Sequence, residues 1–352
     1  MKIAGIVCEY NPFHNGHKYH MEETKRITDS DGIIAVMSGN FVQRGEISLY
    51  SRELRAQTAC ENGADLALLI PPRFVLRSAQ FYAYNAIYIL NSLGIVDFLS
   101  FGSECGSIEM LETALNTDTA MLKNRLNVGV GYAAAIGTNE ILKSPNNILG
   151  VEYLRALKKL SSGIKPVTLG RNSAQHDEMQ AFGKFASASY IRELAKNGED
   201  FSAFVPQNAD YDGQKMISTD KLWDLISYRL KLGRHDNFEN ILNISEGLNN
   251  RIQKFADLKS FSDCVDAVSC KRYPKARVRR ALLSILLDLE KSDEPPSYTR
   301  VLAANETGKK ILARLRKTAK IPVLSRITKK DLYNIPFLAE EIKANRIITK
   351  GI

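Results

Sequence analysis

Four short apolar runs, separated by segments of helical composition, constrain the fold of this chain more than any other feature. They lie at residues 2–8, 32–37, 64–70 and 96–101. Segments with helical composition lie between or after them, at residues 16–27, 52–62 and 79–93. Strands that are apolar throughout and alternate with helices are typical of a parallel sheet covered on both faces. The pattern therefore predicts an α/β fold with a doubly wound parallel sheet.

The alternation of strands and helices continues, with a strand expected at residues 165–169 and a helix at 187–196. Beyond residue 204 the composition becomes mainly helical. The helical segments lie near residues 220–232, 245–256, 275–289 and 307–319. We therefore expect an α/β domain over residues 1–204 and a mainly helical domain over residues 205–352. In a doubly wound sheet, ligands bind where the loops at the carboxyl ends of the strands converge.

Positive charge is concentrated near the C-terminus. The formal net charge of the whole chain is +9. Residues 271–352 contain 20 Lys/Arg and 8 Asp/Glu, a balance of +12, which leaves −3 for residues 1–270. A concentrated positive region commonly binds a polyanion, of which nucleic acid is the most frequent. A well-solvated, lysine-rich helical surface is the alternative interpretation.

Cysteine usage and the length of the apolar runs exclude several other classes of protein. The five cysteines are scattered without a CxxC pair, which indicates neither a zinc knuckle nor a disulfide framework. No charged leader followed by an apolar stretch opens the chain, and the longest apolar runs, such as residues 281–287, are too short to cross a bilayer. We expect a soluble, cytoplasmic protein with no membrane partner.

Three of the five histidines, His14, His17 and His20, lie within seven residues that follow the first expected strand. His14-Asn15-Gly16-His17 fits the pattern HxGH at the expected start of a helix, where free N–H groups and the helix dipole favour phosphate. Gly16 lets the backbone approach a nucleotide, and imidazoles three residues apart can both donate to phosphate oxygens. A metal site built on these histidines and a purely structural role are the alternatives.

The HxGH element resembles the signature of the nucleotidylyltransferase superfamily, which includes class I aminoacyl-tRNA synthetases and adenylyltransferases. Its members usually carry a second signature similar to ISSTxxR, and residues 186–192 read ASASYIR here. The resemblance implies that Ser187 and Ser189 bind the triphosphate and that Arg192 neutralises the departing pyrophosphate. Taken alone, Ser-x-Ser-x-x-Arg at a helix start is more often an N-cap. The expected catalytic residues are His14, His17 and Arg192.

A closer resemblance, to the bacterial tRNA(Met) cytidine acetate ligases, covers nearly the whole chain. The motifs that carry it are EYNPFHNGH at 9–17, MSGNFVQRGE at 37–46, FGSE at 101–104, SPNNIL at 144–149 and SASYIR at 187–192. The family implies that acetate and ATP form acetyl-adenylate with release of pyrophosphate. The acetyl group then passes to N4 of the wobble cytidine of elongator tRNA(Met). ATP is then a substrate, Mg²⁺ is its expected companion, and acetate and tRNA are the partners.

The nucleotide site that this resemblance implies begins in the loop after the first strand. It comprises Val7, Cys8, Glu9, Tyr10, Asn11, Pro12, Phe13, His14, Asn15, Gly16, His17, Lys18, Tyr19 and His20. Gly102, Asn147, Arg171, Asn172 and Ser189 complete the implied site. Within it, Pro12 is expected to fix the entry loop and Phe13 to pack beneath that loop.

Basic residues crowd the start of the apolar helix expected at residues 281–287. This cluster consists of Lys271, Arg272, Lys275, Arg277, Arg279 and Arg280. Positive charge at a helix N-terminus is unfavourable by roughly 0.3 to 1 kcal/mol per group, so we expect these residues to bind RNA. A second cluster consists of Lys309, Lys310, Arg314, Arg316, Lys317 and Lys320. Tyr273 and Tyr298 either stack on unpaired bases or pack in the core.

Two other functions fit the same motifs. A small-molecule adenylyltransferase would turn over without RNA, and it gives no reason for the positive C-terminal region. A non-catalytic RNA-binding or assembly factor that kept an ATP pocket would release no pyrophosphate with any carboxylate.

Overall fold

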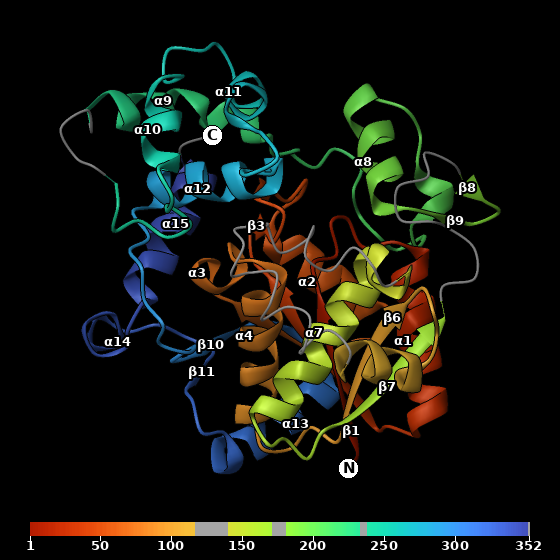
Figure 1. The fold of residues 1–352 in the computed structure, drawn as a ribbon. Coiled ribbons are helices and arrows are strands. Elements are labelled where there is room, and N and C mark those ends of the chain that lie inside the picture. The colour runs from red at the N-terminus through yellow and green to blue at the C-terminus, as the bar shows by residue number, and fades with distance from the viewer. Residues whose placement is uncertain (117–139, 171–180, 233–237, 351–352) are drawn as a thin grey trace.

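A seven-stranded sheet forms the centre of the molecule (Figure 1), and the computed structural model describes residues 1–116, 140–170, 181–232 and 238–350. The strand order is β11-β10-β5-β2-β1-β6-β7. The strands are β1 (Ile3–Cys8), β2 (Gly32–Ser38), β5 (Leu66–Ile70), β6 (Phe98–Ser103), β7 (Lys165–Gly170), β10 (Thr299–Ala304) and β11 (Val323–Leu324). Neighbouring strands from β5 to β7 pair in parallel. The predicted parallel sheet is therefore confirmed for these five strands.

Helices occupy most of the segments that the sequence predicts to be helical. The first group consists of α1 (Asn15–Thr28), α2 (Arg52–Glu61), α3 (Pro72–Val75), α4 (Ala79–Ser92), α7 (Pro145–Lys159) and α8 (Ala188–Asn197). The second consists of α9 (Trp223–Leu232), α10 (Leu248–Gln253), α11 (Phe261–Val268), α12 (Lys275–Leu287), α13 (Glu306–Thr318), α14 (Lys329–Asn334) and α15 (Leu338–Lys350). None of the helices described is both long and apolar enough to cross a membrane.

Shorter elements connect these helices and strands. The 3₁₀ turns are η1 (Glu140–Lys143), η2 (Ser202–Phe204) and η3 (Thr219–Leu222). Two antiparallel hairpins pair β3 (Phe41–Val42) with β4 (Glu46–Ile47) and β8 (Ala181–Phe182) with β9 (Phe185–Ala186). The β3–β4 hairpin follows the carboxyl end of β2, so it belongs to the edge of the sheet where ligands are expected.

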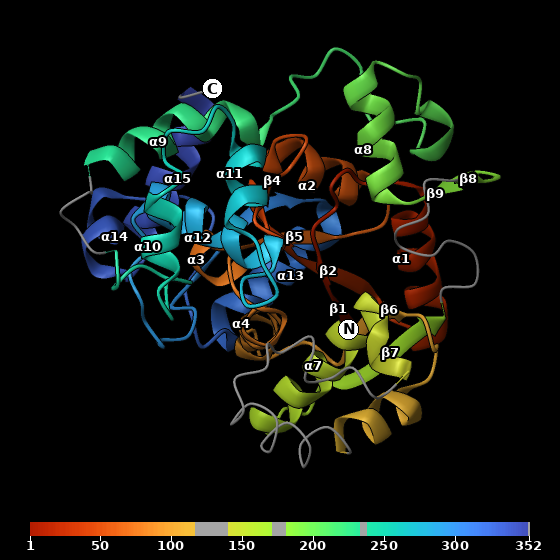
Figure 2. The same ribbon diagram turned by 45° about the horizontal axis from the view of Figure 1, so that its top comes forward.

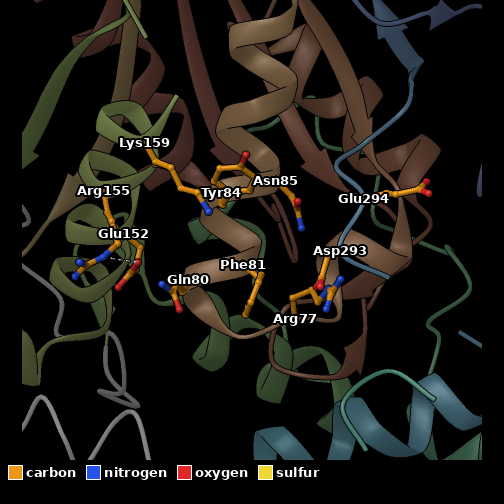
Figure 3. A pocket seen from close by; sticks show the side chains of 11 residues that line it. Arg77, Gln80, Phe81, Tyr84, Asn85, Glu152, Arg155, Lys159, Asp293 and Glu294 are labelled. Atoms are coloured by element: carbon orange, nitrogen blue, oxygen red, sulfur yellow. Dashed lines mark hydrogen bonds and ion pairs between the residues drawn. The ribbon is translucent and has the colours of Figure 1, made fainter. Parts of the chain in front are cut away.

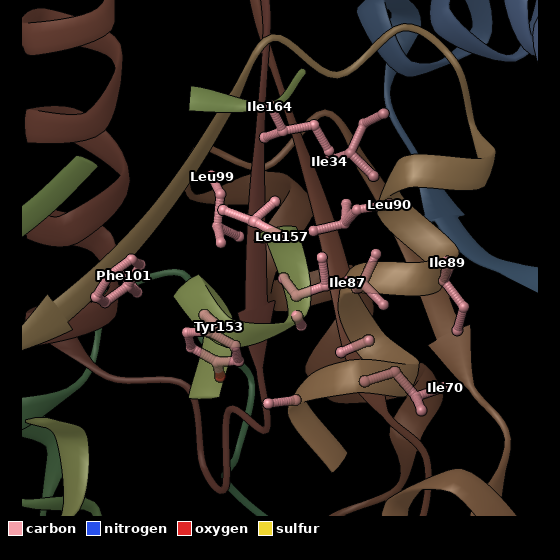
Figure 4. Close-up of a cluster of buried hydrophobic side chains, with 14 of the residues drawn as sticks. Ile34, Ile70, Ile87, Ile89, Leu90, Leu99, Phe101, Tyr153, Leu157 and Ile164 are labelled. Atoms are coloured by element: carbon pink, nitrogen blue, oxygen red, sulfur yellow. The ribbon is translucent and has the colours of Figure 1, made fainter. Parts of the chain in front are cut away.

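One face of the sheet packs against α4, α7 and α13. Figure 4 shows part of this core, in which Ile34 and Leu99 of the sheet share a buried cluster with Ile87 and Leu90 of α4 and Leu157 of α7. Burial of a Leu or Ile side chain contributes about 1.5–3 kcal/mol. This layer therefore fixes α4 and α7 on the strands whose carboxyl ends carry the candidate site.

Helices α1 and α2 cover the opposite face of the sheet. Met21 of α1 and Ala56 of α2 share a second buried cluster with Ala35 and Ala67 of the sheet. Both faces of the central strands are thus buried. This two-sided burial explains why their sequences are apolar without interruption.

The chain returns to the sheet after residue 298, where the sequence predicts only helices. Strand β10 pairs antiparallel with β5, with Val301 opposite Leu68, and β11 pairs parallel with β10. The segment beyond residue 204 is mainly helical, as predicted, but the sequence did not indicate these two strands. Most residues of β10 are only half-buried, which explains the lack of a continuous apolar run. The division at residues 204 and 205 stays a prediction, and it would assign this edge of the sheet to the C-terminal domain.

A third buried cluster lies among the C-terminal helices. Ile226 of α9, Val265 of α11 and Leu282 of α12 are its central members, and Ala344 of α15 joins them. Phe41 of the β3–β4 hairpin belongs to the same cluster, so this hairpin connects the helices to the sheet edge. Figure 2 shows helices α9 to α12 on one side of that edge and α8 on the other.

Buried ion pairs join helix α15 to the first part of the chain. Glu341, which is 1% exposed, pairs with Arg52 of α2 and, at 2.8 Å, with Arg300 of β10. Glu340 pairs with Arg73 of α3 at 2.6 Å. Removal of one partner from a buried pair leaves an uncompensated charge and costs about 3–5 kcal/mol. The C-terminal helix is therefore held against α2 and α3 by charge as well as by apolar packing.

Candidate active site

A cavity of about 230 Å³ opens at the carboxyl ends of β1 and β6. Its first group of lining residues comes from the β1–α1 segment and consists of Ile6, Val7, Cys8, Glu9, Tyr10, Asn11, His17 and His20. Gln43 and Arg44 of the β3–β4 hairpin, Tyr82 of α4, Gly102 of β6, Asn146 and Tyr153 of α7, and Ser189 and Arg192 of α8 line it as well. Segments distant in sequence thus meet where a doubly wound sheet binds its ligand.

The two histidines of the HxGH element form the start of α1. His14 is the N-cap, its Nδ1 accepts a hydrogen bond from Gly16 N at 3.1 Å, and its own N–H donates to His17 Nδ1 at 3.3 Å. Because each Nδ1 accepts, the proton of each neutral ring lies on Nε2. A Cβ atom at Gly16 would lie 2.9 Å from His14 Cε1, so a side chain there would displace the cap. The local sequence therefore sets the tautomer of both imidazoles.

Aromatic rings hold His17 in place. The His14 and His17 ring centroids are 3.7 Å apart, and the rings of Tyr10 and Phe13 lie 4.8 and 5.6 Å from that of His17. Phe13 is fully buried, as the sequence predicts. The Tyr211 hydroxyl fixes the backbone of Phe13, since it accepts from Phe13 N at 3.0 Å and donates to Phe13 O at 3.2 Å. The His17 ring is thus positioned before any ligand binds.

Arg192 approaches the same cavity from α8. Its guanidinium donates to Asn11 O at 2.8 Å and to Ser189 Oγ at 3.1 Å. Burial lowers the pKa of Arg192, while Glu46 and Glu9 favour its charged form. Ser187 caps α8 by accepting from Tyr190 N at 3.1 Å, so the N-cap interpretation is confirmed for this serine. Ser189 and Arg192, one turn of helix apart, remain directed at the cavity.

Two further residues support the cavity. The sequence placed Glu9 only in the implied nucleotide site, and it did not single out Arg55. Glu9 lines the cavity and accepts a hydrogen bond from Gln43 N at 2.7 Å, and desolvation raises the pKa of its carboxyl group. Arg55 is fully buried beneath the loops that follow β1 and β2, where it donates to the carbonyl oxygens of Glu9, Ser38 and Gly39. Burial lowers the pKa of Arg55 to about 10. Arg55 therefore positions both loops from below.

Gly102 lines the cavity, whereas Asn147 lies behind its wall. Asn147 is 3% exposed, and its side-chain oxygen accepts from Glu104 N at 2.9 Å and Cys105 N at 3.1 Å. Glu104 in turn accepts from Asn147 N at 2.8 Å. This reciprocal pair joins the loop after β6 to the start of α7. Asn147 is thus placed to position the neighbouring Asn146, which faces the cavity.

Several residues of the implied nucleotide site lie beside the cavity instead of lining it. These are Pro12, Phe13, His14, Asn15, Gly16, Lys18 and Tyr19. Asn15 donates to Lys184 O at 3.0 Å and Ala203 O at 3.1 Å, so its side chain holds a neighbouring loop. His20 Nε2 lies 3.0 Å from Ser100 Oγ of β6. Arg171 and Asn172 lie outside the described residues.

The lining includes Gln43, Arg44, Tyr82 and Tyr153, none of which the sequence assigned to the site. Gln43 and Arg44 belong to the MSGNFVQRGE motif, so the motif itself was the available signal. No comparable signal marks Tyr82 and Tyr153, which lie within helices of ordinary composition. Within the described part of the chain, no group of three or more His, Cys, Asp or Glu could hold a metal ion.

The basic cluster at the start of α12 divides into an exposed part and a part that contacts the hairpin. Lys271, Arg272 and Lys275 are exposed, with surface ion pairs from Arg272 to Glu246 and from Lys275 to Asp266. Arg277 belongs to neither part, since it pairs with Glu246 at 2.9 Å and donates to Ser245 Oγ at 2.7 Å. Arg279 pairs with Glu46, and Arg280 donates to Gln43 O at 3.3 Å. Burial lowers the pKa of Arg280 to about 10.

The two tyrosines that were candidates for base stacking are both buried. Tyr298 is fully buried and its hydroxyl donates to Phe337 O at 3.4 Å. Tyr273 is 6% exposed and donates to Glu246 O. The base-stacking alternative is therefore wrong for both, because neither ring has a free face to offer to a base. Their role in the core is confirmed.

Comparison with known proteins gives consistent matches over the whole chain. Residues 1–351 match the family model described as HIGH Nucleotidyl Transferase. The tRNA(Met) cytidine acetate ligase of Thermoanaerobacter sp. (strain X514) is 36% identical over 384 residues, which cover 99% of this chain and 95% of that protein. The tRNA(Met) cytidine acetate ligase of Clostridium novyi (strain NT) is 35% identical over 366 residues, with 94% and 91% covered.

Two solved structures are similar to this fold across its length. Thermotoga maritima TmcAL in its apo form I superposes with a TM-score of 0.88 at 30% sequence identity, covering 98% of this chain and 92% of that one. The same protein bound with alpha-thio ATP superposes with a TM-score of 0.86. The second of these structures is therefore a protein of this fold with a nucleotide analogue bound.

Proposed function

This chain belongs to the HIGH nucleotidyl transferase family and, within it, to the tRNA(Met) cytidine acetate ligases, and from this premise we propose that it is an ATP-dependent ligase that acetylates elongator tRNA(Met). Acetate and ATP form acetyl-adenylate and pyrophosphate in the first step. In the second step, N4 of the wobble cytidine attacks the acetyl carbonyl carbon and AMP leaves. Such a role would place the enzyme in the cytoplasm.

The observation that carries the proposal is the convergence of His17, at the N-terminus of α1, and Arg192, from α8, on one cavity. An acetate carboxylate needs no general base to attack the α-phosphorus, so the protein must mainly hold the reactants in line and stabilise charge on the phosphates. The Nε2–H of His17 and the backbone N–H groups of α1 can bind phosphate oxygens. Arg192 is placed to meet the charge that grows on departing pyrophosphate.

His14 contributes to this arrangement through His17. Its ring is stacked on that of His17, and its backbone N–H fixes the His17 tautomer. A direct contact of His14 with phosphate, together with the roles of Asn147, Arg171 and Asn172 at the nucleotide, stays part of the proposal. The neighbouring protein with bound alpha-thio ATP supports ATP as the nucleotide.

Glu9 is the candidate base for the second step. Among the lining residues that the structure describes, it is the sole carboxylate. Its raised pKa makes it a stronger proton acceptor than an ordinary glutamate. As the new N–C bond forms and the C–O bond to AMP breaks, N4 must lose one proton. We assign that proton to the Glu9 carboxylate.

Mg²⁺ would enter the site together with ATP. Mg²⁺ commonly binds phosphate oxygens and water with only one or two protein carboxylates. The donor set of the cavity, which is rich in imidazole, guanidinium and amide groups, fits a phosphate-held ion better than a protein cage. When bound, the ion would neutralise charge on the phosphates.

The RNA partner would bind the positive C-terminal region. Lys271, Arg272 and Lys275 are exposed, and the balance of +12 over residues 271–352 supports a polyanion. Arg272 and Lys275 pair with Glu246 and Asp266 at the surface, and such exposed pairs are weak enough for a phosphate to replace the carboxylate. Arg277, Arg279 and Arg280 were expected to join them. Their contacts with protein make them weaker candidates for direct RNA contact.

The test of the proposed function is release of pyrophosphate from ATP with a panel of small carboxylates, with and without bulk tRNA. We expect acetate-dependent release without RNA, and acetylated tRNA when tRNA is added. Turnover to a dinucleotide-type product without RNA would identify a small-molecule adenylyltransferase. Failure to release pyrophosphate with any carboxylate would identify a non-catalytic factor.

A further inference from the structure

A second cavity, of about 400 Å³, lies between α4, α7 and the segment before β10 (Figure 3). Cavities of roughly 300–1,000 Å³ are the usual size for small-molecule sites. Its walls are formed by the first two turns of α4, the last turns of α7, and Asp293 and Glu294. None of these residues lines the candidate active site. The cavity therefore needs a separate explanation.

Aromatic rings form its apolar wall. Phe81 is 46% exposed, and Tyr84, one turn further along α4, lies beside it. Each ring has a cation close to its face: Arg77 Cζ lies 5.3 Å from the Phe81 centroid and Lys159 Nζ lies 4.6 Å from the Tyr84 centroid. Proteins that bind single-stranded nucleic acid commonly combine an exposed aromatic ring, on which a base stacks, with a nearby cation that binds a phosphate.

A polar group lies at the wall of the same cavity. Asn85 lines the cavity and is 5% exposed, and in the described part of the chain its amide is not a fully buried group without a hydrogen-bond partner. Figure 3 shows this side chain directed toward the Asp293 side of the cavity. An amide offers a donor and an acceptor together, which matches the edge of a nucleobase.

Charge is distributed unevenly around the cavity. Lys159 is exposed and, in the part of the chain that the structure describes, makes no ion pair. Arg77 donates to Ser292 O at 2.6 Å, so the guanidinium joins α4 to the segment before β10. Three acidic residues, Glu152, Asp293 and Glu294, balance the three basic ones in the lining, and Glu152 pairs with Arg155 at 3.1 Å. A phosphate can therefore bind only at the Lys159 side, while the Asn85 side, next to Asp293, offers hydrogen bonds to an uncharged base.

Gln43 connects this cavity to the candidate active site. Its side chain donates to Arg77 O at 2.8 Å, and its backbone N–H donates to Glu9 at 2.7 Å. The two cavities also share helices α4 and α7, since Tyr82 and Tyr153 line the first and their neighbours Phe81 and Glu152 line the second. The walls of the two cavities are therefore built on the same two helices and joined through Gln43.

We propose that the second cavity binds an unpaired nucleotide of the RNA substrate, with its base against Phe81 and Asn85 and its phosphate near Lys159. The inference rests on the proposed function, because it is the tRNA that supplies the unpaired nucleotide. This nucleotide is a neighbour in the same loop as the cytidine that enters the active site. The cavity thus holds the loop while chemistry proceeds next to it.

Two variants separate binding from folding. Phe81→Ala removes an exposed ring, and Asn85→Leu replaces an amide that faces the cavity with an apolar side chain of similar shape, so neither should lower the melting temperature substantially. Tyr228→Ala is the matched control, because Tyr228 is a 64% exposed aromatic residue on α9, far from this wall in sequence. The probes are a hairpin RNA with an unpaired loop, a fully paired RNA duplex of equal length, and free AMP and CMP.

We expect Phe81→Ala to weaken binding of the hairpin RNA roughly tenfold, and Asn85→Leu to weaken it by a smaller factor. Binding of the duplex should be unchanged in both variants, and Tyr228→Ala should bind all probes normally. Acetate-dependent pyrophosphate release without RNA should match the unmodified protein.

Unchanged hairpin affinity in both variants would overturn the inference. Loss of AMP or CMP binding with unchanged hairpin affinity would overturn it as well, by identifying a free nucleotide as the occupant. The outcomes that contradict the proposed function differ from those that contradict the second nucleotide site. A protein that releases no pyrophosphate with acetate contradicts the proposed function, whereas reduced hairpin affinity in Phe81→Ala would still support a nucleotide at this cavity.

Discussion

The imidazole rings of His14 and His17 are stacked, with centroids 3.7 Å apart and an interplanar angle of 27°. His17 lines the cavity at the carboxyl ends of the strands, whereas His14 caps α1 and supports His17 from the side. The two histidines of the HxGH element therefore differ in what they contact. This difference can be measured.

Replacement of His17 by alanine should remove a donor to the phosphates. The loss of one such transition-state donor costs about 3 kcal/mol, or roughly a hundredfold in kcat for acetate-dependent pyrophosphate release. His14→Ala should also lower this rate, and loss of the N-cap should cost about 0.5–2 kcal/mol of stability. Steady-state kinetics and thermal melting measure the two effects.

His14→Asn is the matched control for this comparison. Asparagine is a good N-cap, so this variant should recover the melting temperature while the slow rate persists. Normal adenylation by both His17→Ala and His14→Ala would show that neither imidazole acts on the phosphates. Unfolding of both variants would show that the element is structural.

Arg192→Ala should slow pyrophosphate release more than it weakens ATP binding, because charge on the leaving group grows as the bond breaks. We therefore expect kcat to fall about a hundredfold with a smaller change in KM for ATP. Arg192→Lys keeps the charge but loses the two-pronged contact with Asn11 O and Ser189 Oγ, and it should recover only part of the rate. An unchanged kcat in Arg192→Ala would reduce residues 187–192 to a helix cap.

The sheet could be predicted where its strands are buried on both faces. Strands β1, β2 and β5 are almost wholly buried, and this is why each appears as a continuous apolar run. Strand β10 lies toward the edge, pairs antiparallel with β5 and is mostly half-buried. Its sequence, TRVLAA, carries no such run. Its place in the sheet depends on contacts with residues more than 200 positions away, which no local pattern records.

The candidate site was predictable for the HxGH loop and much less so for its supports. The pattern HxGH after an apolar run predicts both a local structure, a helix that starts after a strand, and a chemistry, the binding of phosphate. Arg55, by contrast, is one charged residue in an ordinary helix, and only the fold brings it beneath Glu9 and Gly39. Asn147 was expected at the nucleotide, yet its amide is occupied by the backbone of Glu104 and Cys105. Motifs mark both contact and positioning residues without distinguishing them.

Glu9→Gln should stabilise the protein at neutral pH. Desolvation raises the pKa of Glu9 above the value of about 4.3 for an unfolded chain. A carboxyl group with a raised pKa contributes stability that is fully present below the unfolded pKa and is lost as pH rises through the folded pKa. The glutamine keeps the bond from Gln43 N and avoids this loss. Melting temperatures should therefore favour the variant at neutral pH, and the difference should shrink in acid.

Glu306→Gln is the control of opposite sign. Lys309 lowers the pKa of the exposed Glu306 carboxyl, so this substitution should give no gain at neutral pH. In the reaction, Glu9→Gln should retain pyrophosphate release while acetyl transfer to tRNA slows. A Glu9→Gln variant that transfers acetyl at the normal rate would exclude Glu9 as the base.

The basic cluster at α12 should separate into two functions. Arg279 pairs with Glu46 of the β3–β4 hairpin, and Arg280 donates to Gln43 O. Between these two positions of the hairpin, Gly45 has a φ of 81°, and a Cβ atom on this glycine would lie 2.6 Å from Arg280 N. This close approach holds the hairpin whose Gln43 lines the cavity. Replacing both arginines by glutamine should therefore lower the melting temperature and slow pyrophosphate release even without tRNA.

The exposed residues of the cluster should behave in the opposite way. A variant with Lys271, Arg272 and Lys275 replaced by glutamine should keep its melting temperature and its pyrophosphate release, because these side chains contact neither the hairpin nor the cavity. Its affinity for tRNA should fall, and each lost phosphate contact should flatten the log–log dependence of affinity on salt by somewhat under one unit. An unchanged affinity and salt slope would mean that the exposed lysines form a solvated surface. A normal first step in the Arg279 and Arg280 variant, combined with weaker tRNA binding, would instead assign those arginines to the RNA.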